Sequence, residues 1–259
     1  MATYNKRGYK APKPEEEKTG NEFEEVVDVS DSTTAEVFNT LDETASKTED
    51  FVAKNQKLIL AVVAAIAIGT VGYLLFNRFV TEPKENKANN EIFQAQQFFQ
   101  QATDATEKSD SLYNLALKGG EGKLGFVQIA EQYSGTDAGN LSNYYAGISY
   151  LNIGDFKNAI TYLENFKSKD DILQPLALGA IGDAFSETNK VDDAISFYKK
   201  AAAASTNDFT TPRFLMKAAM LNLDAGKKAE ANKLFVEIKE KYETSKEGMN
   251  IEAFIAMTE

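Results

Sequence analysis

The chain has 259 residues, a formal net charge of −11 and no Cys, His or Trp. These absences exclude disulfides, thiolate chemistry and histidine-based metal sites, and they remove the commonest general base near neutral pH, so we expect no metal, no cofactor and no enzyme. The acidity opposes binding to nucleic-acid backbones, which needs clustered Lys and Arg.

The first predicted segment is a disordered tail over 1–32, because hydrophobic residues are sparse there and Lys, Pro and Glu are clustered. Its start interleaves Tyr4 and Tyr9 with the basic residues Lys6, Arg7, Lys10 and Lys13. Such a segment is either a short contact for anionic lipid, RNA or a protein, or a solvated tail. An acidic run at 15–17 follows directly and weakens the positive field, which favours the solvated tail.

An amphipathic helix is predicted over 33–57. Thr33 and Glu36 have the spacing of a capping box, in which each side chain accepts a hydrogen bond from an exposed backbone N–H at the helix start. Apolar residues then follow near heptad spacing at Phe38, Leu41, Ala45 and Val52. Since the polar face is mostly acidic, it favours packing on a protein partner over binding to anionic lipid.

An uncharged run of 19 residues, LILAVVAAIAIGTVGYLLF, occupies 58–76. At about 1.5 Å per residue it is long enough to cross a hydrocarbon core of about 30 Å, and Tyr73, Phe76 and Phe79 suit a membrane interface. A buried core helix seldom lacks a polar face over this length, and a signal peptide starts closer to the N-terminus. We therefore predict a transmembrane helix in contact with lipid over 58–80, followed by a linker over 81–90.

The basic residues beside this run do not by themselves decide its orientation. Three stand on each side, namely Lys47, Lys54 and Lys57 before it and Arg78, Lys84 and Lys87 after it. The tail adds further Lys and Arg on the N-terminal side, which favours a cytoplasmic N-terminus under the positive-inside rule.

Residues 91–259 contain internal repeats, each read as a helical hairpin. Small residues recur in the first helices at Gly147, Gly182 and Ala219 and in the second helices at Ala159, Ala194 and Ala231. They are expected to let neighbouring helices approach closely. Between the helices, the positions that fit a left-handed helix end are Gly154, Asn189 and Gly226. Aromatic residues expected to fill the space between hairpins are Tyr150, Phe166, Phe185 and Tyr198.

This pattern resembles the tetratricopeptide repeat family (TPR). Two copies match well and a third in part, while the early Trp of the family is replaced by Asn143, Leu178 and Leu215 and its late Pro is missing. The resemblance implies an all-α fold, with one transmembrane helix followed by a TPR-like α-solenoid of hairpins over 91–259 and a concave inner surface.

Two further elements are expected to extend this array. An atypical earlier hairpin would have its first helix over 91–117 and its second over 126–133, with Gly119–Gly122 as the turn between them rather than a phosphate-binding loop. A final helix over 247–257 would cap the stack, since the terminal repeat of a solenoid has one face in water.

The candidate partner-binding residues lie on the first helices of the hairpins, on the side that the repeat pattern turns towards the concave surface. They are Tyr144, Ile148, Asn152, Asp183, Glu187, Arg213, Met216 and Met220. A surface that mixes Tyr, Met and Arg suits a peptide or another extended partner. The adjacent carboxylates Asp192 and Asp193 open a helix, where negative charge is favoured, and are interpreted as structural rather than metal-binding.

The whole layout, with an acidic N-terminal region, one internal span and hairpins to the end, is similar to the YfgM family of bacterial inner-membrane proteins. The resemblance covers the span and everything after it. It implies a single-pass protein with a cytoplasmic N-terminus and a periplasmic repeat domain, accessory to the Sec translocon. The implied partners are translocon subunits, a PpiD-like membrane chaperone and emerging secreted chains.

Two other functions remain open at the level of sequence. The repeats could serve as a scaffold for a different cell-envelope complex, such as one for division or cell-wall assembly. A catalytic protein with an unrecognised carboxylate site is the third reading, and it would need turnover that carboxylate substitution abolishes.

Overall fold

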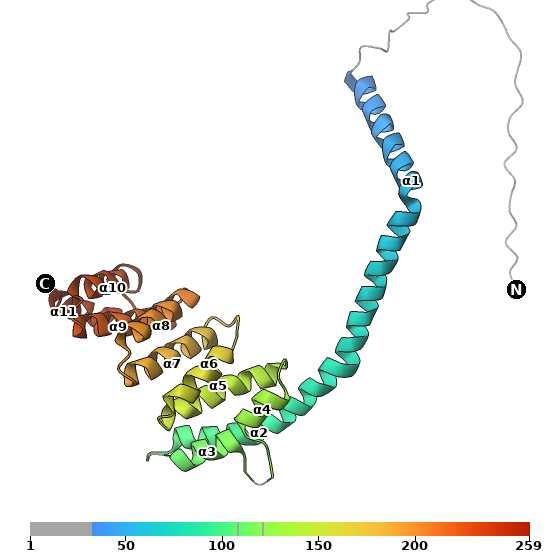
Figure 1. The fold of residues 1–259 in the computed structure, drawn as a ribbon. Coiled ribbons are helices and arrows are strands. Elements are labelled where there is room, and N and C mark those ends of the chain that lie inside the picture. The colour runs from blue at the N-terminus through green and yellow to red at the C-terminus, as the bar shows by residue number, and fades with distance from the viewer. Residues whose placement is uncertain (1–32, 108, 121) are drawn as a thin grey trace, which may run out of the picture. The chain divides into compact units, whose positions relative to one another are not determined.

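The computed structural model describes residues 33–107, 109–120 and 122–259 (Figure 1). The predicted tail over 1–32 lies outside the described residues, and so do the side chains of the predicted capping box and of the first two heptad positions. Among the described residues every regular element is a helix, which confirms the all-α fold. The chain divides into two compact units, one that ends at Gly69 and one that begins at Thr70.

The helices follow one another along the chain in a fixed order. They are α1 (Thr33–Phe76), the π-helical turn η2 (Asn77–Thr81), α2 (Glu82–Asp104), α3 (Asp110–Lys118), α4 (Phe126–Gln132), α5 (Asp137–Asn152), α6 (Phe156–Asn165), α7 (Leu173–Glu187), α8 (Val191–Ala204), α9 (Thr210–Asp224), α10 (Lys228–Lys241), the 3₁₀ turn η3 (Gly248–Asn250) and α11 (Ile251–Ala256).

Helix α1 contains both the predicted amphipathic segment and the apolar run. Many large apolar side chains of the run are more than half exposed, among them Leu58, Leu60, Val62, Val63, Ile66, Ile68 and Val71. Within the part of the chain that the structure describes, one helical stretch, Lys47–Asp104, is long and apolar enough to cross a membrane, and its apolar window is not buried against protein. This exposed apolar surface is compatible with a membrane-spanning helix and differs from that of a buried core helix.

The structure corrects the expected linker over 81–90, because this stretch is helical. Helix α2 follows η2 directly, and the N–H of Glu82 donates to the carbonyl of Asn77, five residues back. Pro83 lies in the first turn of α2, where it lacks an N–H and its ring crowds the carbonyl four residues earlier. A wider π turn relieves that crowding, so the apolar run passes into α2 without leaving helical geometry.

Helix α2 is attached to α5 through its first turn. The Glu85 carboxylate accepts hydrogen bonds from the backbone N–H groups of Asp137 at 2.7 Å and Ala138 at 3.1 Å. The Lys84 Nζ donates to the carbonyl of Ser134 at 2.7 Å. Since Asp137 and Ala138 begin α5, the carboxylate lies at the positive end of that helix, where negative charge is stabilising.

The predicted helix over 91–117 is corrected to two helices. Helix α2 ends at Asp104, Ala105 takes an extended conformation with ψ 138°, and α3 begins at Asp110. Asp, Thr and Ser surround this break at Thr103, Asp104, Thr106, Ser109 and Asp110, and their side chains compete with the backbone for hydrogen bonds and so favour helix ends. The break lets α3 pack on α2, with Ala116 and Leu117 fully buried in a shared core. The expected turn before α4 is present, with Gly119 at φ 84°.

Three hairpins form the predicted repeats, pairing α5 with α6, α7 with α8, and α9 with α10. Their turn residues adopt the predicted left-handed conformation, with φ 81° at Gly154, 57° at Asn189 and 73° at Gly226. In each turn the residue after the left-handed one donates its N–H to the carbonyl five residues earlier, as in Asp155 to Tyr150 at 2.9 Å. The left-handed residue itself donates to the carbonyl three residues earlier. This shared pair of bonds satisfies the last carbonyls of each first helix and fixes the reversal of the chain.

Close contacts between helices occur at the predicted small residues. A Cβ built on Gly147 would lie 2.4 Å from Leu163 Cγ, and one on Gly182 would lie 2.6 Å from Tyr198 Cδ1. The matching alanines of the second helices, Ala159, Ala194 and Ala231, are fully buried. The small residues therefore set the spacing within each hairpin.

The C-terminal helix has the place predicted for the cap. It is divided into η3 and α11 and lies against α10, where the Phe235 and Phe254 rings stack with centroids 5.6 Å apart. Ile251 is buried there, which closes the core at this end of the array.

A test of the helix spacing uses Gly179, whose added Cβ would lie 2.0 Å from Phe214 Cε1 on the next hairpin. Gly179→Ala is expected to lower the free energy of unfolding by about 1–3 kcal/mol, because this overpacking outweighs the helix-propensity gain of about 0.5–1 kcal/mol. Urea denaturation measures the change.

The matched comparison is the double variant with Phe214→Leu, which removes the clashing ring. We expect the two changes to couple favourably by at least about 1 kcal/mol. Additive losses would show that the two residues do not constrain each other.

Candidate protein-binding surface

The candidate residues divide into three groups in the structure. Asn152, Asp183 and Glu187 line one cleft of about 580 Å³. The other residues of the cleft are Leu151, Gly154, Phe156, Ser186, Tyr198 and Lys217. The cleft thus combines the C-terminal parts of α5 and α7 and the start of α6 with one side chain each from α8 and α9.

Tyr144 and Ile148 do not reach that cleft. Both are half-buried and pack against the apolar cluster that contains Leu163 and Phe166, and the ring centroids of Tyr144 and Phe166 are 5.2 Å apart. Burial raises the pKa of the Tyr144 hydroxyl above its ordinary value. These two residues therefore serve packing between hairpins at least as much as any partner.

The α9 candidates are also separated from the cleft. Met216 and Met220 are half-buried against the core cluster around Phe214 and Phe235. Arg213 is exposed and lines a different hollow of about 450 Å³, together with Asp208, Phe209, Lys246 and Glu247. The structure therefore does not gather the eight candidates into one continuous site.

Asp183 is the centre of the polar contacts in the cleft. One of its carboxylate oxygens, Oδ1, accepts a hydrogen bond from the Tyr198 hydroxyl at 2.5 Å and an ion-pair contact from Lys217 Nζ at 2.5 Å. The Lys217 ammonium lies 5.3 Å from the centroid of the Tyr198 ring. The side chains of Asp183 and Lys217 are each about one-third exposed, so both remain accessible to a partner.

The position of Tyr198 follows from the glycine opposite it. Because Gly182 has no side chain, the Tyr198 ring lies directly across α7 and its hydroxyl reaches Asp183, the next residue. Burial, and then the hydrogen bond to Asp183, raise the pKa of Tyr198 above its ordinary value. Tyr198 therefore stays neutral and acts as a hydrogen-bond donor.

Sequence reasoning missed both Tyr198 and Lys217 as members of this surface. Tyr198 was assigned only to packing, because it belongs to a second helix. Lys217 directly follows the candidate Met216. Its positive charge, which can pair with Asp183 of the preceding repeat, is the sequence feature that could have identified it. In the structure the cation lies on the accessible side and the methionine against the core.

The charge distribution of the cleft favours a cationic or hydrogen-bonding group. Glu187 is exposed at the end of α7, and among the described residues no cation forms an ion pair with it. The negative ends of the α5 and α7 dipoles lie nearby at Asn152 and Ser186. Across the part of the chain that the structure describes, no three carboxylates lie together as metal ligands would.

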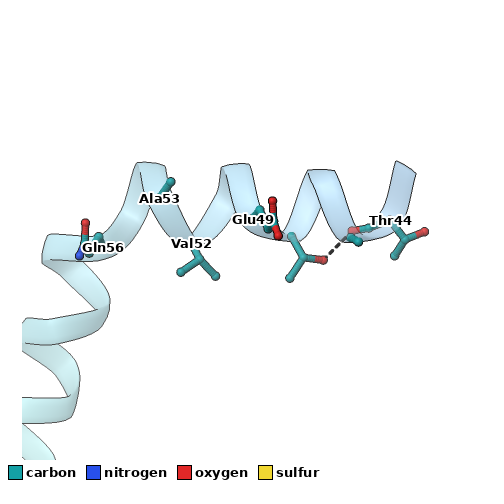
Figure 2. Close-up of a pocket in the computed structure, with 7 residues that line it drawn as sticks. Thr44, Glu49, Val52, Ala53 and Gln56 are labelled. Carbon is teal, nitrogen blue, oxygen red and sulfur yellow. Dashed lines mark hydrogen bonds between the residues drawn. The ribbon is translucent and has the colours of Figure 1, made fainter. Parts of the chain in front are cut away.

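A separate, larger hollow of about 770 Å³ follows the surface of α1. Its lining is Thr44, Ala45, Thr48, Glu49, Val52, Ala53 and Gln56, which recur at the three- and four-residue spacing of one helix face. Figure 2 labels Thr44, Glu49, Val52, Ala53 and Gln56 among them. The predicted heptad positions Ala45 and Val52 belong to this face. Because the lining comes from a single helix, it is a surface on which another helix could pack rather than an enclosed site.

Comparison with known proteins finds one repeat family. A tetratricopeptide repeat model matches residues 142–170, which include most of α5 and all of α6. Neither the curated proteins nor the solved structures give a significant match. The match and the all-helical structure define a TPR-like protein with one apolar helix before a helical repeat region. Repeats of this family are typically non-catalytic surfaces for protein–protein interaction.

Tyr198→Phe tests the hydrogen bond to Asp183 through its dependence on pH. Because the pKa of Tyr198 is raised in the folded state, its contribution is complete below the unfolded value of about 10 and is lost as pH rises above it. The free energy of unfolding of the unsubstituted chain should therefore fall more steeply above about pH 10 than that of the variant. Urea denaturation between about pH 8 and pH 11 measures both slopes.

The control is Tyr133→Phe, whose hydroxyl makes no hydrogen bond to a carboxylate among the described residues. It should keep the slope of the unsubstituted chain. Equal slopes for Tyr198→Phe and the unsubstituted chain would contradict the role given to this contact.

Proposed function

We propose that this chain is a membrane-anchored protein-binding adaptor or chaperone, accessory to the Sec translocon and acting on secreted or envelope proteins. The observation that carries the anchoring is the uncovered apolar surface of the run between Leu58 and Phe76. In water each such side chain would forgo about 1.5–3 kcal/mol of burial, whereas in a bilayer it is solvated by lipid.

The segments of the proposal follow the predicted organisation with one change. The tail is 1–32, the juxtamembrane helix 33–57 and the transmembrane helix 58–80. Helix α2 takes the place of the linker and the start of the repeat region over 91–259. The N-terminus is cytoplasmic and the repeats are periplasmic.

The protein-binding role is supported by the repeat match and by the cleft at Asp183. A membrane anchor confines such a surface to a thin layer, which raises its effective concentration for anchored partners such as a PpiD-like chaperone. Assignment to the translocon is supported by the order of elements, which is similar to that of the YfgM family.

A scaffold for another envelope complex is the second candidate. It is favoured by the exposed face of α1 between Thr44 and Gln56, which lies on the opposite side of the apolar run in sequence from the repeats. A protein with a helix-packing face before the span and a repeat surface after it could join components on both sides of a membrane.

Affinity capture from native membranes after crosslinking separates these candidates. We expect translocon subunits to be recovered with the unsubstituted chain, and Glu187→Lys to reduce their recovery by about tenfold, since it reverses the unpaired charge of the cleft. Glu164→Lys is the matched control, because Glu164 is an exposed carboxylate on the second helix α6. Consistent recovery of division or cell-wall components without translocon subunits would support the scaffold instead.

Orientation can be measured cleanly because the chain has no cysteine of its own. Glu49→Cys and Glu164→Cys each place one thiol at an exposed position, before and after the apolar run. A membrane-impermeant maleimide applied to intact cells should label Glu164→Cys and leave Glu49→Cys unlabelled until the cells are lysed. The reverse labelling pattern would place the repeats in the cytoplasm. Release of the chain from membranes by alkaline carbonate would contradict the proposed membrane anchor.

A further inference from the structure

The outer side of α2 has an uncharged stretch in its second half. Residues 92–103 contain no Asp, Glu, Lys or Arg, although 26% of the chain is charged. Ile92, Ala95 and Phe98 face the core and are buried. On the opposite side Phe93 is 61% exposed, and Gln97 is exposed one turn further on.

This side of α2 borders an open hollow of about 450 Å³. Its lining is Phe93, Gln96, Gln97, Phe99, Gln100, Gln101 and Tyr145. The half-buried rings of Phe99 and Tyr145 meet edge to face, with centroids 5.0 Å apart, and form an aromatic base. The glutamines and Phe93 surround that base, so the hollow combines apolar area with side-chain amides.

The glutamine amides retain hydrogen-bonding capacity. Among the described residues, Gln100 donates to Asp104 at 2.9 Å, whereas Gln96, Gln97 and Gln101 make no side-chain hydrogen bond to protein. Each amide offers two donors and one acceptor, the same chemistry as a peptide backbone. An extended chain can therefore bond to them whatever its own sequence, and no charge of the surface has to be desolvated.

The geometry points to a binding site for an extended, uncharged apolar polypeptide segment on this surface of α2. Phe93 packs on an apolar side chain of the segment, and the glutamines bond to its backbone. This inference rests on the proposed chaperone function and names the class of chain that it recognises. An uncharged segment suits this surface because both are uncharged, whereas the protein as a whole is acidic.

A lipid surface fits these residues less well. Phe93 lies 13 residues beyond position 80, the end of the proposed span, along consecutive helical elements, which is about 20 Å along the helix at about 1.5 Å per residue. The headgroup layer on one side of a bilayer is only about 6 Å deep. The surface also lacks the Lys and Arg that attract anionic headgroups.

The experiment uses the full chain in phosphatidylcholine nanodiscs and a fluorescent 12-residue peptide of Leu, Ser and Gly with blocked ends. We expect the peptide to bind and Phe93→Ala to weaken it by about tenfold, with no change in the helical circular dichroism spectrum. The control is Phe209→Ala, which removes a similarly exposed ring, 57% exposed, from a different hollow. A second peptide with two Leu replaced by Asp should bind at least about tenfold more weakly.

Equal binding by Phe93→Ala and the unsubstituted chain, or equal binding of the two peptides, would overturn the inference. A photoreactive amino acid in place of Gln97 identifies the occupant, and crosslinks to lipid or to a second copy of the chain instead of the peptide would also overturn it. The nanodisc experiment contains no translocon, so its outcome is independent of the capture experiment. If the peptide binds but translocon subunits are not captured, only the assignment to the translocon is contradicted. If translocon subunits are captured but the peptide does not bind, only the inferred peptide site is contradicted.

Discussion

Close approach of helices at residues without large side chains is the constraint on which the rest of the repeat region depends. Gly147 and Gly182 admit Leu163 and Tyr198 within their hairpins, and Gly179 admits Phe214 from the next hairpin. Since interiors are packed at crystal-like density, these contacts leave little freedom for one helix to rotate against its neighbour. They also determine the functional surface, because the ring that fills the space above Gly182 carries the hydroxyl that donates to Asp183.

A second constraint connects the apolar run to the repeats. The π turn before Pro83 keeps the chain helical, and the Glu85 carboxylate then binds the first N–H groups of α5. Fixing a carboxylate at a helix start satisfies donors that the helix itself leaves unpaired. The helix α2, which follows the apolar run in sequence, therefore also supplies core residues that pack with α5 of the first hairpin.

The sequence allowed prediction of those features that depend on local chemistry. The left-handed turns at Gly154, Asn189 and Gly226 and the small residues of the hairpins follow from rules that involve few neighbours. The expected linker over 81–90 was wrong because a proline among charged residues resembles a loop, whereas a proline is tolerated in the first turn of a helix. The cleft was predicted only in part, because a register change of one residue rotates a side chain by about 100°, and Tyr198 reaches it from a second helix.

The two surfaces of the second unit make different demands on a partner. A group that enters the cleft must compete with or complement the bonds of Asp183 to Tyr198 and Lys217, so the cleft discriminates by charge and geometry. The occupant inferred for the α2 surface needs only a peptide backbone and uncharged apolar side chains, which many different unfolded segments offer. A polypeptide long enough to reach both the selective cleft and the less selective α2 surface would bind with a higher effective affinity than to either surface alone. Such a combination suits a protein that must accept many sequences yet act only beside its own partner.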